Sequence, residues 1–103
     1  MKPYDTALTI VAPKGLEENL VDRLLELSEL VSGFTITRVE GQGHAMPLHG
    51  TTEEVRGRAR RAEIQIVMNG EDAARLIGQL KQALPISEIA YWMTPVTEFG
   101  RFK

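Results

Sequence analysis

Residues 41–61, GQGHAMPLHGTTEEVRGRARR, lie between two short stretches that each read as a β-strand. A connection this long with no periodic pattern of its own is uncommon in compact domains and often carries function. It holds both histidines of the chain, and its last six residues include the arginines Arg56, Arg58, Arg60 and Arg61. Its length and composition make it the first place to look for a ligand site.

The two stretches beside this connection alternate between apolar and polar residues, as half-buried strands do. Before it, residues 33–39 place Phe34 and Ile36 on one face. After it, residues 62–68 place their apolar residues on one face, namely Ala62, Ile64, Ile66 and Met68. The connection therefore joins two strands of a hairpin, although hairpin loops normally need only two to five residues.

The rest of the chain supplies two helices and two more strands. Residues 6–12 and 86–95 alternate like the hairpin strands. Residues 16–31 and 70–84 instead carry apolar residues at three- and four-residue steps, which predicts amphipathic helices. Asn69 is a candidate N-cap for the second helix, whose first turn is acidic.

The predicted element order is β-α-β-β-α-β. Two right-handed β-α-β units of this kind form a four-stranded antiparallel sheet with both helices on one face, the ferredoxin-like arrangement of the α+β class. The other face is too apolar for a fully solvated surface, because it would carry Thr9, Val11, Thr35, Thr37, Gln65, Val67, Ala90 and Trp92. We expect oligomerisation through this face; the alternative is a weakly apolar face in contact with solvent.

Composition narrows the classes of function. With 103 residues, 43% of them hydrophobic, the chain can bury one core. Its net charge of −2 is unlike the basic balance of a nucleic-acid-binding domain. Residues 6–12 and 62–68 also lack the aromatic side chains on which RNA-recognition modules of this topology stack bases. We therefore expect no nucleic-acid partner.

The chain contains no cysteine, which excludes disulfides, thiolate metal sites and a cysteine nucleophile. The apolar run before Pro13 is too short for a signal peptide or a membrane span, so we expect a cytoplasmic location. No arrangement of serine, histidine and aspartate and no pair of catalytic carboxylates can be argued from the sequence. We therefore predict a protein that is not an enzyme.

These motifs resemble those of PII-type signalling proteins, which share the element order and a long T-loop in the central hairpin. Residues 33–43, GFTITRVEGQG, are similar to the family's G-hydrophobic-T-hydrophobic-T-x-V-x-G-x-G. Residues 62–67, AEIQIV, resemble the strand that returns from the T-loop, and residues 93–96, MTPV, resemble the last strand. The resemblance implies a single PII-like domain over residues 1–103, with a T-loop at about residues 41–61.

A closer resemblance is to small divergent PII-like proteins encoded beside heavy-metal efflux systems. In them the GxGH start and the V-x-G-R-x-x-R end of the loop recur, here residues 41–44 and 55–61. The resemblance implies a homotrimer with ligand clefts between subunits, closed by the T-loops. It also implies signalling through the T-loop to a partner, such as a membrane transporter or another regulated protein.

The chain departs from the usual nucleotide site of the PII family. Residues 83–88, ALPISE, stand where the family has a glycine-rich, lysine-bearing phosphate loop, and they contain neither residue type. The T-loop also lacks the tyrosine that is uridylylated in nitrogen-regulatory members. The arginines at the end of the loop are candidates to replace the missing phosphate contacts.

Guanidinium groups bind phosphate and carboxylate through two parallel hydrogen bonds. Extension of the returning strand would put Arg56, Arg58 and Arg60 on one face. The resemblance to PII proteins adds a pair of basic residues near the C-terminus, Arg101 and Lys103. The predicted anion site then comprises Gly41, Gly43, His44, Arg56, Arg58, Arg60, Arg61, Arg101 and Lys103. Alternatively, the arginines pair with surface acids such as Glu53 and Glu54.

A transition-metal site is the second prediction. Imidazole is the commonest metal ligand among side chains, and a thioether is a soft one, so His44, Met46 and His49 form a candidate set. Solvated histidines, or His44 stacked on a bound base, are the alternatives. The sequence thus predicts a PII-like regulator that binds an adenine nucleotide or a metal ion, or else a metal-binding accessory protein in heavy-metal resistance.

Overall fold

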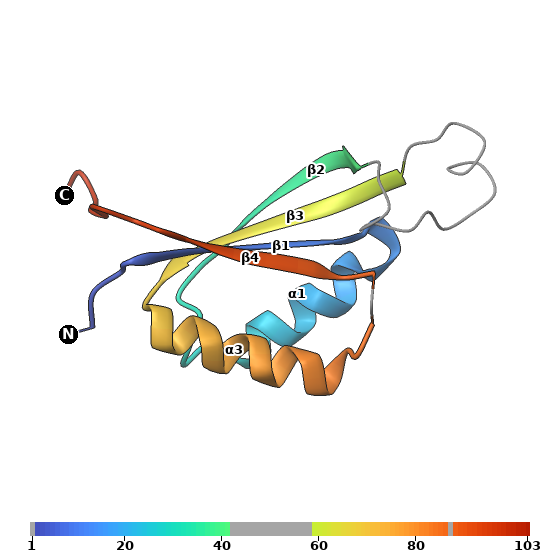
Figure 1. Cartoon of the computed structure of the whole chain (residues 1–103), viewed down its shortest axis with the longest axis horizontal. Helices are drawn as coiled ribbons and strands as arrows, with labels where there is room; N and C mark the ends of the chain where they lie inside the picture. Colours follow the sequence, from blue (N-terminus) through green and yellow to red (C-terminus); the bar gives the residue numbers. More distant parts are fainter. Residues whose placement is uncertain (1, 42–58, 87) are drawn as a thin grey trace.

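The computed structural model describes residues 2–41, 59–86 and 88–103. Figure 1 shows the predicted order of strands and helices. The elements are β1 (Thr6–Pro13), η1 (Lys14–Leu16, a 3₁₀ turn), α1 (Glu17–Glu26), β2 (Thr35–Gly41), β3 (Ala59–Met68), α3 (Gly70–Ala83) and β4 (Ala90–Pro95).

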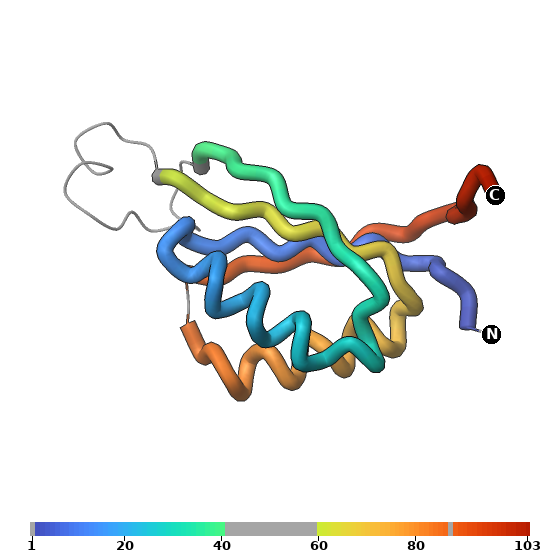
Figure 2. The backbone as a smooth tube through the Cα atoms, turned by 180° about the vertical axis from the view of Figure 1, so that it is seen from behind, coloured from blue at the N-terminus to red at the C-terminus, as the bar shows by residue number. Residues whose placement is uncertain are grey.

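The strands form one antiparallel sheet in the order β2-β3-β1-β4. Ile10 of β1 lies opposite Ile64 of β3 on one side and opposite Tyr91 of β4 on the other. Both helices cover the same face of the sheet, as Figure 2 shows from behind. The ferredoxin-like α+β prediction is therefore confirmed.

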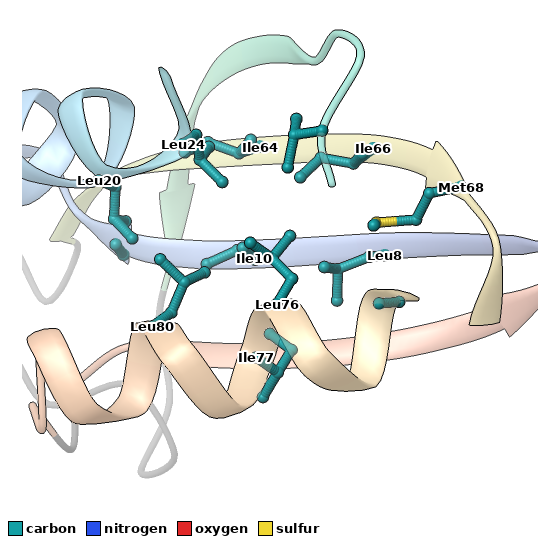
Figure 3. Packing of buried hydrophobic residues seen from close by; sticks show 13 residues of the cluster. Leu8, Ile10, Leu20, Leu24, Ile64, Ile66, Met68, Leu76, Ile77 and Leu80 are labelled. Atoms are coloured by element: carbon teal, nitrogen blue, oxygen red, sulfur yellow. The ribbon is translucent and has the colours of Figure 1, made fainter. Parts of the chain in front are cut away.

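The core lies between the sheet and the helices, where β1 and β3 contribute alternate residues and each helix contributes one apolar stripe. Figure 3 shows how these side chains interdigitate. The buried set includes Leu8, Ile10, Ile64, Ile66 and Met68 from the strands, Leu20 and Leu24 from α1, and Leu76, Ile77 and Leu80 from α3.

The first helix is shorter than predicted. α1 ends at Glu26, and the Leu27 N–H donates to the carbonyls of Arg23 and Leu24 at 3.2 Å. The chain then turns, and the Val31 N–H donates to the Leu27 carbonyl at 3.0 Å. Val31 is still buried against the core, so the apolar spacing continues past the helix end for reasons of packing.

The strand boundaries also differ from those predicted. β2 continues to Gly41 and β3 begins at Ala59, and these two residues are paired. Arg60 and Arg61 therefore belong to a strand, and the connection is narrowed to residues 42–58. β4 starts at Ala90, later than expected, because the chain turns first: the Ile89 N–H donates to the Ile86 carbonyl at 3.1 Å.

The predicted N-cap of the second helix is confirmed. The Asn69 side-chain oxygen accepts from the backbone N–H groups of Glu71 and Asp72 at 3.1 and 3.4 Å. The Asn69 amide donates to the Pro3 carbonyl at 3.1 Å, and the Asp5 carboxylate accepts from the Gly70 N–H at 2.9 Å. The cap therefore also ties the N-terminal segment to the start of α3.

The face of the sheet away from the helices carries the residues that alternation assigned to it. Thr9 lies opposite Gln65 and Trp92, and Gln65 lies opposite Thr35. Trp92 is 43% exposed, whereas Thr9 and Val11, on the interior strand β1, are buried. No helix in the described part of the chain is long and apolar enough to cross a membrane.

Candidate functional site

The loop-side ends of β2 and β3 meet the start of η1. Here Arg61 lies opposite Val39 on one side and Pro13 on the other. These elements surround a cavity of about 280 Å³, which we call the loop-base hollow. Its lining residues are Lys14, Arg38, Val39, Glu40, Arg60 and Arg61.

Strand alternation separates the two described arginines of the predicted cluster. Arg60 lies opposite Glu40 and shares the helix-facing side with Ala62, whereas Arg61 points to the other side. Arg60 is exposed, but Arg61 is fully buried and has interactions within the structure. A buried guanidinium is costly unless it is well partnered, so Arg61 combines a structural role with its position at the hollow.

Arg38 is a site residue that the sequence prediction missed. Its Nη2 donates to Glu17 Oε2 at 3.2 Å, which links β2 to the first turn of α1. The Arg38 side chain remains 65% exposed, whereas that of Glu17 is only 16% exposed. Arg38 can therefore turn part of its guanidinium fork toward a ligand while one nitrogen stays on Glu17.

The side chains that the structure describes around the hollow include more cations than acids. Among the described residues, the cations are Lys14, Arg38, Arg60 and Arg61, and the facing acids are Glu17 and Glu40. Lys14 joins the site because η1 follows β1 directly. The sequence held no signal for Lys14 or Arg38, because only the strand register brings them to the loop base.

The C-terminal pair of the predicted site lies elsewhere. Arg101 and Lys103 line a second cavity of about 660 Å³, the tail hollow, with Lys2, Pro3, Tyr4, Phe99 and Gly100. The rings of Tyr4 and Phe99 lie 4.9 Å apart, and the Arg101 guanidinium lies over the Phe99 ring at 5.6 Å. The tail hollow thus joins an aromatic surface to several cations.

The two hollows lie at opposite ends of the sheet, as Figure 1 shows from the position of the C-terminus. At one end Pro13 pairs with Arg61; at the other, the Val96 N–H donates to the Asp5 carbonyl at 2.9 Å. An eight-residue strand separates them by about 23 Å. For the residues that the structure describes, one chain does not bring the two halves of the predicted site together.

The remaining predicted residues lie outside the described part of the chain. They are Gly43, His44, Met46, His49, Arg56 and Arg58; Gly41 is described as the last residue of β2. Within the described residues there is no group of three or more histidine, aspartate or glutamate side chains placed to hold a metal ion. The metal site at His44, Met46 and His49 therefore stays a prediction.

Solved structures share this fold over nearly the whole chain. A DUF3240 family protein from Shewanella baltica OS155 is 21% identical, with a TM-score of 0.76 over 98% of this chain and 99% of that one. A putative PII-like signalling protein from Thermus thermophilus is 25% identical, with a TM-score of 0.63 over 89% of this chain and 86% of that one.

Two further likenesses concern the fold alone. CPII, a nitrogen regulatory PII-like protein from Thiomonas intermedia bound to ADP, AMP and bicarbonate, is 19% identical, with a TM-score of 0.68 over 94% of this chain and 93% of that one. The periplasmic divalent cation tolerance protein CutA from Archaeoglobus fulgidus is 15% identical, with a TM-score of 0.69 over 94% of this chain and 88% of that one.

A search of curated proteins finds no match to the sequence. The resemblance to the PII-like fold that the motifs indicated is confirmed by the solved structures. A family model matches residues 3–103, and the chain therefore belongs to the family described as "Protein of unknown function (DUF3240)".

Proposed function

We propose that this chain is a PII-like regulatory protein that binds an adenine nucleotide through its phosphates at the loop-base hollow. The observation that carries the proposal is that, among the described residues, Arg38, Arg60 and Lys14 line that hollow together although they come from three different elements. Guanidinium forks match phosphate oxygens, and a lysine adds a compact positive charge.

The connection between α3 and β4 lacks the residues that would bind phosphate, which supports placing the phosphates at the loop-base hollow. Residues 83–88, ALPISE, offer no glycine for close approach of the backbone and no lysine, and Pro85 has no N–H group to donate. Phosphate contacts must therefore come from the loop base, which carries more of the binding than it does in PII proteins with the glycine-rich loop.

The nucleotide site is completed by a second copy of the chain. The tail hollow provides the aromatic pair Tyr4 and Phe99 with Arg101 beside it, groups suited to stacking a base and holding an anion. Because it lies at the far end of its own sheet, it reaches a loop-base hollow only across an interface. A ring of three chains satisfies this requirement three times over.

Regulation in this proposal depends on ligand contacts that exist in only one state of the protein. A nucleotide that binds Arg38 and Arg60, at the root of residues 42–58, shifts the population of forms that this segment presents to a partner. A membrane transporter is one such partner. The direction of regulation follows from which form the partner binds.

Calorimetric titration with ATP, ADP and AMP tests the proposal. We expect saturable binding to the unmodified chain. Because a charge-assisted hydrogen bond contributes about 1.5–3 kcal/mol, Arg38→Met should weaken binding roughly tenfold to hundredfold. Arg75→Met removes the same charge from an exposed site on α3 and should leave binding unchanged. No heat with any of the three nucleotides at millimolar concentration would exclude a nucleotide ligand.

Metal binding is the second candidate function. It merits a test because this chain shares its fold with a divalent cation tolerance protein. In this case His44 and His49, with Met46, bind Cu, Ni, Zn or Co, and the chain is an accessory protein in heavy-metal resistance. The double change His44→Ala with His49→Ala should abolish stoichiometric binding measured by calorimetry. Undiminished metal binding by the double variant would rule these ligands out.

A further inference from the structure

A third cavity, of about 440 Å³, opens at the C-terminal end of α3, and we call it the helix-end hollow. Its floor is the core, where Ile10 and Leu20 line it but are each only 1% exposed. The accessible apolar walls are therefore the partly exposed residues after α3, among them Leu84, Ile86 and Ile89. Figure 3 shows Leu20 and Leu80 facing each other at this end of the core. The other lining residues are Ile77, Lys81, Leu84, Pro85, Ile86, Ile89 and Tyr91.

The described residues of the lining are apolar except at one edge. There the Lys81 ammonium donates to the Tyr91 hydroxyl at 3.4 Å and lies 5.1 Å from the centre of the Tyr91 ring. A hydroxyl that accepts one hydrogen bond still has its own hydrogen to donate. The edge therefore presents one full positive charge and one O–H donor beside an apolar interior.

This combination is what a small-molecule site requires. Ligand sites of roughly 300–1,000 Å³ are mostly apolar, with a few polar groups that fix the orientation of the ligand. The volume is about three times the roughly 150 Å³ of an apolar cavity that holds a benzene ring. The single positive charge of Lys81 can balance the single negative charge of a carboxylate. A phosphate carries more negative charge, and part of it would remain uncompensated.

We propose that the helix-end hollow binds a monocarboxylate with an apolar body. The apolar body lies against Leu84, Ile86 and Ile89, and the carboxylate accepts hydrogen bonds from Lys81 and Tyr91. The described residues that line the loop-base hollow and those that line the helix-end hollow form two separate sets. The inference is therefore independent of the nucleotide site, and either can fail without the other.

The test is a titration of the isotope-labelled chain with octanoate, followed by backbone amide shifts in NMR spectra. We expect one saturable site, with the largest shifts at Leu84, Ile86 and Ile89. Octylammonium has the same apolar body and the opposite charge, and it should bind at least tenfold more weakly. Absence of saturable shifts at millimolar octanoate, or equal affinity for the two compounds, would overturn the proposal.

Variants distinguish this site from general apolar association. Lys81→Met should weaken octanoate binding about tenfold and remove the preference over octylammonium, because the charge that discriminates between them is gone. Arg75→Met, a matched loss of charge on the same helix, should bind like the unmodified chain. Ile86→Trp, which fills the hollow, should block octanoate. Unchanged binding in both Lys81→Met and Ile86→Trp would place octanoate elsewhere and contradict the proposal.

Discussion

Single side chains decide how the loop base is built. Arg38 reaches across from β2 to Glu17 at the start of α1, and Glu40 lies opposite Arg60 on the neighbouring strand. Each acid therefore balances part of the positive charge that an anion would meet. In the proposed nucleotide site, we therefore expect the acids to affect ligand affinity as much as the arginines do.

Glu17→Gln tests this balance. The substitution removes one negative charge beside Arg38 and keeps the shape of the side chain. We expect ATP to bind roughly two- to fivefold more tightly, because the competing ion pair contributes about 0.4–1 kcal/mol. Calorimetry at low and high salt gives the measurement, and the gain should shrink as salt rises. Weaker binding in the variant would show that Glu17 helps to hold the ligand.

Asn69 joins the start of α3 to the N-terminal segment. Asn69→Ala removes both the cap of the helix and the bond to the Pro3 carbonyl, and it should lower the free energy of unfolding by about 1–2 kcal/mol. Asn69→Asp keeps the capping oxygen, so its free energy of unfolding should fall by less. Urea denaturation measures both, and equal losses would mean that the cap contributes nothing beyond the amide bond to Pro3.

At the scale of elements, periodicity in the sequence predicted the α-helices and strands of the described residues but misplaced several of their ends. The apolar spacing through Leu30 and Val31 extended the first helix too far, because packing against the core continues after the backbone leaves the helix. The cluster of arginines in the sequence was enough to identify Arg60 as a candidate. The position of Lys14 and Arg38 at the loop base depends instead on the register of β1, β2 and β3. Local patterns carry no information on that register.

The pairing of Gly41 with Ala59 predicts that the hairpin does not need its long connection. Replacing residues 42–58 with Asn-Gly, which suits a two-residue hairpin turn, should preserve the fold. Shortening the closed loop should raise the free energy of unfolding by up to about 2 kcal/mol. Circular dichroism and urea denaturation provide the check. A chain that fails to fold would show that residues 42–58 are needed for stability.

At the scale of the whole molecule, those predicted binding residues that the structure describes divide between two ends of one sheet. The sequence indicated which basic residues to consider, but it held no reason to separate Arg101 and Lys103 from the loop base. The separation follows from the direction of β4, which runs away from the loop base toward the tail hollow. The nucleotide proposal therefore requires an oligomer.

The size of the assembly can be measured directly. We expect the chain to form a homotrimer, with the exposed Trp92 and its neighbours on the open face of the sheet buried between subunits. Trp92→Asp should dissociate the assembly, because it puts a charge into an apolar interface. Light scattering coupled to gel filtration gives the mass of both forms. A monomeric unmodified chain that still binds ATP would contradict the shared site.

The most direct test of the central claim, that loop base and tail of different subunits share one nucleotide site, uses mixed oligomers. Arg38→Met and Arg101→Met chains, each deficient in ATP binding alone, are unfolded, mixed in equal amounts and refolded together. A site is intact only when the subunit that supplies the loop base keeps Arg38 and the neighbour that supplies the tail keeps Arg101. Each condition holds for half of the subunits in an equal mixture, so random assembly into closed rings should restore about a quarter of the sites. Calorimetry counts the sites. Recovery of about a quarter is the result we predict, and no recovery in a fully assembled mixture would contradict it.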